Sequence, residues 1–139
     1  MTKINDMTLT FPALSENEAF SRTSVAAFVT RLDPTLNDLM DIKTAVSEAV
    51  TNAIIHGYEN SEGYISVHCE IKNREVKIEI TDSGIGIDDI DKAKEPLFTT
   101  KPEQERSGMG FSVMEAFMDK VHVKSARGKG TKITMCKTV

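Results

Sequence analysis

Hydrophobic and polar residues alternate in five short stretches of the chain, which is the period expected of β-strands with one buried face. The last four stretches form two pairs, and a short turn rich in polar residues or glycine separates the members of each pair. This arrangement predicts two β-hairpins. The five stretches cover residues 7–11, 65–71, 76–80, 121–125 and 131–136.

Three other segments carry large apolar residues three and four positions apart, the spacing of one buried helix face. The first should begin at Ser15, which can form a capping box with Glu18, and should end near Leu32. We also expect Phe20 of this segment to be part of the core, because large apolar residues at helical spacing usually pack there. The apolar positions of the first stripe are Val25, Phe28, Val29 and Leu32.

A second helix is predicted from Asp33-Pro34, a helix-start signal, to about Ile55. Gly57 follows it and suits a left-handed cap. A third helix is expected to open at 108–110. The apolar positions of these two helices are Leu39, Ile42, Val46, Ala49, Val50 and Ala53, and then Phe111, Met114, Phe117 and Met118.

Residues 88–107 show no regular period and contain two prolines and many charges. So long a stretch without regular structure is typically a functional lid or binding loop. The order of elements therefore predicts an α+β fold, a two-layer sandwich with helices on one face of a mostly antiparallel sheet. The length of 139 residues fits a single domain spanning 1–139.

The charge, the apolar runs and the cysteines of the chain exclude some classes of function. The net charge of −4 argues against nucleic acid as the main partner, because phosphate binding favours a basic surface. No apolar run has the length of a membrane span, and 1–11 lacks the apolar block of a signal peptide, so we expect a cytoplasmic protein. Cys69 and Cys136 lack metal-ligand spacing and are expected to be buried, inert thiols.

The second predicted helix carries a polar pair, Glu48 and Asn52, four residues apart and hence on one face. An amide oxygen is a suitable ligand for Mg²⁺, and a neighbouring carboxylate can accept a proton. On its own, such a pair is more typical of a solvated helix flank than of a site.

The motif Asp82-x-Gly84-x-Gly86 follows the second strand of the first hairpin. A carboxylate at a strand end can accept a hydrogen bond from an exocyclic amine, and glycines let the backbone approach a ligand closely. The alternative is an ordinary turn after an edge strand, because aspartate and glycine are standard turn residues.

A third motif, Arg106-Ser107-Gly108-Met109-Gly110, stands at the start of the last predicted helix. Glycines at a helix start expose backbone N–H groups at the positive end of the helix dipole, which favours an anion. Arg106, together with Lys101 in the preceding loop, could add positive charge beside a phosphate. A plain helix start explains the same residues without a ligand.

Taken in order, these motifs resemble the ATP-binding domain shared by gyrase, Hsp90, histidine kinases and MutL, over residues 11–135. The resemblance implies that Asn52 holds Mg²⁺, that Asp82 binds adenine with support from Thr131, and that Glu48 is the base. It implies ATP and ADP as ligands. The other implied nucleotide-contacting residues are Gly84, Gly86, Thr99, Thr100, Lys101, Arg106, Ser107, Gly108, Met109 and Gly110.

Within that superfamily, the segments 15–20, 46–58, 96–102 and 106–111 resemble the sigma F-type anti-sigma kinases of endospore-forming bacteria. This resemblance implies a homodimeric serine kinase that inhibits a sporulation sigma factor and phosphorylates an anti-anti-sigma protein. It implies that Arg22 contacts both partners and that the nucleotide state selects between them through the lid.

Three alternatives remain open from the sequence. They are a general-stress anti-sigma kinase of the same family, a histidine kinase catalytic domain, and a non-catalytic module that only binds the sigma factor. The second is disfavoured because the chain begins with a strand rather than with a helix carrying a phosphoacceptor histidine. Glu48 argues against the third.

Overall fold

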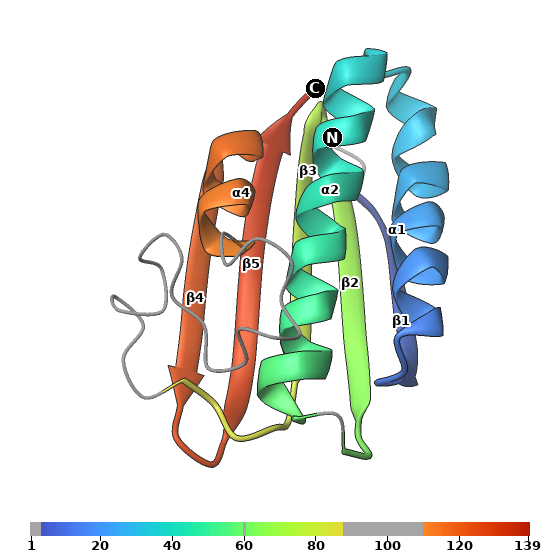
Figure 1. Ribbon diagram of the computed structural model, residues 1–139. Helices are drawn as coiled ribbons and strands as arrows, with labels where there is room; N and C mark the ends of the chain where they lie inside the picture. Colours follow the sequence, from blue (N-terminus) through green and yellow to red (C-terminus); the bar gives the residue numbers. More distant parts are fainter. Residues whose placement is uncertain (1–3, 60, 88–109) are drawn as a thin grey trace.

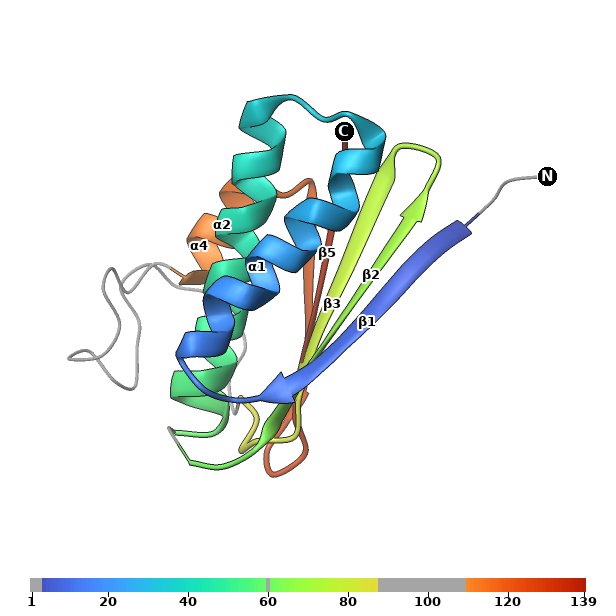
Figure 2. The same ribbon diagram turned by 90° about the vertical axis from the view of Figure 1, so that its right-hand side faces the viewer.

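The computed structural model describes residues 4–59, 61–87 and 110–139. These residues form two layers, with the helices on one face of a five-stranded sheet (Figure 1). The layers are seen edge-on in Figure 2, where all the labelled helices lie on the same side of the strands. The predicted α+β sandwich is therefore confirmed. The predicted lid at 88–107 lies outside the described residues.

The sheet is antiparallel throughout and has the strand order β1-β2-β3-β5-β4. Each strand contains the alternating stretch that predicts it and extends beyond that stretch. In the register of β3 and β5, Asp82 lies opposite Thr131, so two predicted site residues are neighbours across the ladder. The strands are β1 (Ile4–Pro12), β2 (Tyr64–Lys72), β3 (Glu75–Asp82), β4 (Lys120–Ala126) and β5 (Gly130–Thr138).

Helix α2 lies between α1 and α4 and contacts both (Figure 1). A 3₁₀ turn extends α1, and a π-helical turn, Ala53–Gly57, continues α2 directly beyond Asn52. Single π-helical turns within helices occur frequently at functional sites. In the described part of the chain, no helix has the length and apolar character needed to cross a bilayer. The helices are α1 (Glu16–Val29), α2 (Leu36–Asn52) and α4 (Gly110–Phe117).

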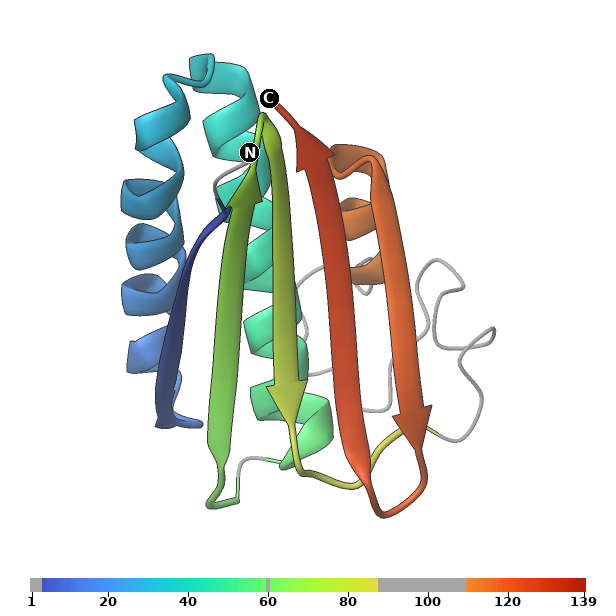
Figure 3. The ribbon, with the colours of Figure 1, turned by 180° about the vertical axis from the view of Figure 1, so that it is seen from behind.

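The core fills the space between the helices and the inner face of the sheet. Its buried side chains come from both the helices and the strands, so the helices pack on the strands beneath them. Figure 3 shows the sheet from behind, where none of the helices in the described part of the chain covers its other face. Fully buried side chains of the core include Val25, Val29, Ile42, Val46, Val50, Ile65, Val67, Ile78, Met114 and Met135.

The first helix starts where predicted, with Ser15 as the N-cap of α1, but the predicted capping box is wrong. Ser15 has helical backbone angles and makes no side-chain capping bond, and the Glu18 carboxylate accepts a hydrogen bond from the Ser47 hydroxyl of α2 at 2.6 Å. The predicted start of the second helix at Asp33-Pro34 is also wrong. The second start lies at Thr35, whose hydroxyl accepts from the backbone N–H of Asp38 at 3.1 Å. Asp33 has φ +49° and belongs to the turn before it.

Phe20 is also placed differently from the prediction, since it is 54% exposed. The buried face of α1 passes through Ser21, Val25 and Phe28, and Phe20 lies about 100° around the helix from Ser21. Between the two thiols, Cys69 is buried as predicted, whereas Cys136 is half-buried. Burial raises the pKa of the Cys69 thiol to about 12, which keeps it protonated and inert.

Candidate functional site

The candidate site lies where the C-terminal ends of α2 and β3 meet the hairpin between β4 and β5, at the lower end of Figure 1. Contact between the first two elements is close at Gly57. A Cβ atom added there would lie 3.0 Å from the carboxylate of Asp82. Gly57 has no positive φ, so the predicted left-handed cap is wrong and the glycine instead leaves room for Asp82.

Asp82 is the last residue of β3 and is only 5% exposed. Its Oδ1 accepts a hydrogen bond from the backbone N–H of Gly84 at 2.9 Å. Burial raises the pKa of the Asp82 carboxyl, and hydrogen bonds from the backbone of Gly84 and Thr131 partly oppose that rise. A buried carboxylate with so few donors around it is a strong acceptor for an amine that enters the site.

The glycines of the Asp82 motif are required by close backbone contacts. A Cβ at Gly84 would overlap the carbonyl oxygen of Gly57, which itself accepts a hydrogen bond from Ile85 N at 2.8 Å. Gly86 has φ +80°, and its Cβ would overlap the carbonyl of Ala126 in the β4–β5 hairpin. The motif is therefore packed between the end of α2 and the hairpin and is not a free turn.

We expect Gly84→Ala to destabilise the fold by about 2–3 kcal/mol, because the new methyl group overlaps backbone atoms that cannot rotate away. Gly128→Ala is a useful comparison, since a Cβ there meets nothing within 4 Å and only the positive φ of +76° is strained. That strain costs about 1–2 kcal/mol. Urea unfolding of both variants measures the difference, and an equal loss would contradict the close packing at Gly84.

Thr131 is buried at the start of β5 beside Asp82. Its hydroxyl lies 2.8 Å from the hydroxyl of Ser125 in β4. The Ser125 hydroxyl also donates to the carbonyl of Gly130 at 3.0 Å and accepts from the N–H of Ile87 at 2.7 Å. Ser125 therefore ties the residue that follows the Asp82 motif to the strand that carries Thr131.

Three contributors to the site were missed by the sequence reasoning, namely Ser125, Tyr58 and Gly130. The Tyr58 hydroxyl accepts from the N–H of Ser83 at 2.7 Å and donates to the carbonyl of Tyr64 at 2.6 Å, which braces the end of β3. Gly130 has φ +83° and allows the hairpin to approach the carbonyl of Asp82. The strand register could have indicated Gly130, but no local pattern marks the other two.

Glu48 and Asn52 are half-buried on the last two turns of α2, at the edge of its buried stripe, as predicted. Asn52 ends the α-helical part, and the π-helical turn that follows leads to Gly57 beside Asp82. The amide oxygen of Asn52 is a suitable ligand for a hard cation such as Mg²⁺, and the carboxylate of Glu48 lies one helical turn before it.

The third motif is only partly described. Gly110 begins α4, which packs against α2. The other predicted residues of the lid and of this motif lie outside the described residues: Thr99, Thr100, Lys101, Arg106, Ser107, Gly108 and Met109.

Arg22 lies on α1, and its side chain is 42% exposed. Its Nε lies 3.4 Å from Oε2 of Glu18, and the other oxygen of that carboxylate accepts from Ser47. Ser47 directly precedes Glu48 in α2. A chain of polar contacts thus links Arg22 on the surface to the helix that carries the candidate base.

Comparison with known proteins agrees with this geometry. The profile of the family described as histidine kinase-like ATPase domain matches residues 11–137. The chain is 59% identical over 133 residues to an anti-sigma F factor of Clostridium kluyveri, covering 96% of this chain and 94% of the relative.

Two further relatives bear the same name. An anti-sigma F factor of Clostridium acetobutylicum is 59% identical, with 96% of this chain and 93% of the relative covered. One from a Thermoanaerobacter species is 55% identical over all 139 residues, which are 97% of the relative. The resemblance inferred from the motifs is thereby confirmed, and the chain belongs to the anti-sigma F factors within the family of histidine kinase-like ATPase domains.

Proposed function

We propose that the chain is an anti-sigma factor and an ATP-dependent protein serine kinase, which inhibits a sigma F-type sporulation factor and phosphorylates its anti-anti-sigma antagonist. The observation that carries the proposal is the buried Asp82 carboxylate, framed by glycines and Thr131 at the end of the helix that bears Glu48 and Asn52. The family implies nucleotide binding, and these described residues have the chemistry for it.

Asp82 would anchor the base of the nucleotide. Its carboxylate would accept a hydrogen bond from the exocyclic amine of adenine, and the adjacent Thr131 hydroxyl would support that contact. Guanine presents a carbonyl where adenine has this amine, so a buried carboxylate at that place would repel it. The burial of Asp82 makes such discrimination strong, because an unmatched polar pair out of water is costly.

Asn52 would hold Mg²⁺ through its amide oxygen, with the cation supplying charge neutralisation for the phosphates when bound. The first turn of α4, which begins at Gly110, would present backbone N–H groups toward the phosphate end of the nucleotide. Phosphoryl transfer depends mainly on such positioning and neutralisation. Glu48, one turn before Asn52, would accept or orient the proton of the attacking serine hydroxyl.

The proposed protein partners rest on the relatives, which are named anti-sigma F factors. We propose that residues 1–139 form one domain and that the chain works as a homodimer in the cytoplasm. A general-stress anti-sigma kinase would have the same fold and chemistry, and the names of the relatives favour the sporulation type.

The test is a transfer assay with the purified chain, γ-labelled ATP, Mg²⁺, and anti-anti-sigma proteins of both the sporulation and the general-stress type. Label on a serine of the sporulation-type protein is expected. Label on the general-stress protein alone would assign the chain to the other branch. If neither anti-anti-sigma protein is labelled but the chain still captures the sigma factor, the chain is a non-catalytic binding module.

Arg22→Ala should weaken binding of both protein partners about tenfold or more, because an exposed guanidinium that pairs across an interface contributes roughly 1.5–3 kcal/mol. ADP affinity should be unchanged. Arg31→Ala is the matched control, since Arg31 is exposed and stacks over Phe28 at 4.4 Å within its own helical region. Surface plasmon resonance with each partner measures the effect, and normal capture by the Arg22 variant would remove it from the interface.

A further inference from the structure

Lys137 is a charged residue on the core-facing side of β5. The inward row of this strand contains Thr131, Ile133 and Met135, all of them buried, and Lys137 is the next inward position. Its side chain is only 12% exposed. A lysine so far out of water requires partners, because an unpaired buried ammonium is strongly disfavoured.

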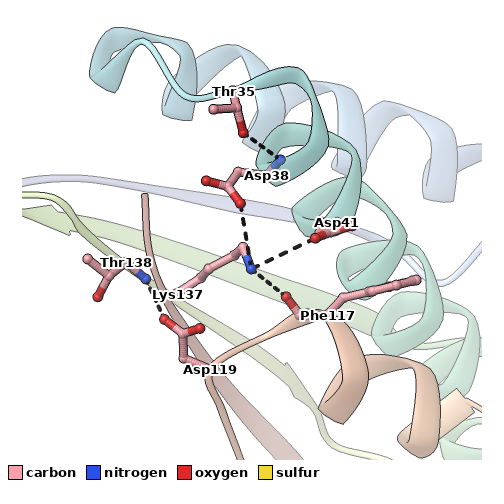
Figure 4. A network of polar contacts seen from close by, with 7 residues as sticks. All are labelled: Thr35, Asp38, Asp41, Phe117, Asp119, Lys137 and Thr138. Carbon is pink, nitrogen blue, oxygen red and sulfur yellow. Dashed lines mark hydrogen bonds and ion pairs between the residues drawn. The ribbon is translucent and has the colours of Figure 1, made fainter.

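Its partners come from two helices (Figure 4). The Nζ of Lys137 donates to the carbonyl of Phe117, the last residue of α4, at 2.8 Å. It also lies 3.8 Å from Oδ1 of Asp38 and 3.9 Å from Oδ2 of Asp41, both in the first turns of α2. One ammonium group therefore joins the end of α4 to the beginning of α2.

The segment after α4 is fixed to the same strand. The N–H of Asp119 donates to the carbonyl of Cys136 at 2.9 Å, and the carboxylate of Asp119 accepts from the N–H of Thr138 at 2.7 Å. The two bonds reach Cys136 and Thr138, the residues on either side of Lys137 in β5. The C-terminal end of α4 and the segment after it are thus both tied to β5, and Figure 4 shows the bond of Lys137 to Phe117 and that of Thr138 to Asp119.

A helix of eight residues is too short to be stable by itself, so α4 depends on tertiary contacts, which are the packing of Phe111 and Met114 in the core and the Lys137 tie at its end. A cation at its last carbonyl also complements the negative end of its dipole. Since this end of α4 lies against the first turns of α2, α4 begins toward the half of α2 that carries Glu48 and Asn52 (Figure 1). Gly110 lies roughly 10 Å from Phe117 along the axis, so a tilt at one end displaces the other.

We infer that Lys137 is a positioning residue for the phosphate end of the nucleotide, which it serves by fixing α4 relative to α2. The inference rests on the proposed function. The inference concerns only the phosphate end of the nucleotide. The adenine contacts belong to β3 and to the opposite end of β5, where Asp82 and Thr131 have their own hydrogen bonds. Loss of Lys137 should therefore weaken phosphate binding selectively.

The experiment compares the affinities of AMP and Mg-ATP for the full chain by calorimetry, in the wild type and in Lys137→Met, which keeps the aliphatic stem and removes the charge. Mg-ATP affinity should fall about three- to tenfold, the range expected for a cation at a helix end, while AMP affinity stays within about twofold. Lys137→Arg, which restores the charge and the donors, should recover most of the loss.

Lys132→Met is the matched control on the same strand. Lys132 forms an ion pair with Glu79 at 2.8 Å and, at 46% exposure, faces outward. It should leave both affinities unchanged. Asp41→Asn removes one partner of Lys137 and should cause a smaller loss of the same selective kind, which provides the readout if Lys137→Met does not fold.

Equal losses for AMP and Mg-ATP, or no loss, would overturn the inference and assign Lys137 to stability alone. Persistence of the loss in Lys137→Arg would do the same. A wild-type chain that binds neither nucleotide would instead overturn the proposed function, and this inference with it.

Discussion

Replacing Asp82 by asparagine should lower the affinity for ADP by roughly 5- to 150-fold, which corresponds to about 1–3 kcal/mol for a hydrogen bond to a charged group. The substitution puts an amide in place of an acceptor-only carboxylate, so a donor can face the adenine amine. Calorimetric titration with ADP and Mg²⁺ measures the change.

The same variant should remain folded. Burial already disfavours the charged form of Asp82, and the asparagine oxygen can still accept from Gly84. Asp6→Asn is the control, because Asp6 is an exposed aspartate on the edge strand β1, two strands away from β3 in the sheet. If a folded Asp82→Asn protein bound ADP normally, the assignment of Asp82 to the adenine site would be wrong.

The raised pKa of Asp82 gives this prediction a pH signature. As pH falls, the carboxyl should protonate at a higher pH than an ordinary aspartate does, and ADP affinity should fall with it. The effect on folding has the opposite sign. Because the native state binds this proton more tightly than the unfolded state, the contribution of Asp82 to stability is largest below the ordinary aspartate pKa and decreases as pH rises through the raised pKa. Asp82→Asn should remove both dependences.

Glu48→Gln should retain nucleotide binding and lose phosphotransfer by about 10²- to 10⁴-fold, the usual contribution of a positioned general base. Glutamine keeps the shape and the helix propensity of the side chain, so α2 should be preserved. Single-turnover transfer from labelled Mg-ATP to the anti-anti-sigma protein measures the rate.

Glu115→Gln in α4 is the comparison for Glu48, since it changes the same charge at an exposed position of a helix. It should transfer phosphate at the wild-type rate. A wild-type rate in Glu48→Gln as well would show that Glu48 neither accepts nor orients the serine proton.

The sequence predicted the layers of the fold well, because strand alternation and helix stripes depend on which side of each element is buried. Ile65, Val67 and Ile78 are buried as their spacing indicates. The contacts at helix ends were less predictable. Ser15 is the N-cap of α1 as its pattern indicates, but the capping box does not form. Glu18 instead bonds to Ser47 of another helix, and such a contact between distant residues has no local signal.

The candidate site was likewise predictable where it stands in a local motif and unpredictable where it depends on tertiary contacts. Asp82, Gly84 and Gly86 stand in a recognisable motif, and the structure places them against the end of α2 and the β4–β5 hairpin. Ser125 and Tyr58 could not be inferred, because their roles arise from the tertiary packing that brings their hydroxyls to Thr131 and Ser83. Lys137 is a visible exception in the pattern, since it is a charged residue in the inward row of β5, but only the structure identifies its partners.

The most direct test of the account is a comparison of ADP and GDP binding to the intact chain in the presence of Mg²⁺. A buried carboxylate that selects the 6-amino group of adenine over the 6-carbonyl of guanine predicts saturable binding of one ADP per chain and at least about tenfold weaker binding of GDP. Equal affinity for the two nucleotides, or no saturable binding of ADP, would contradict the account.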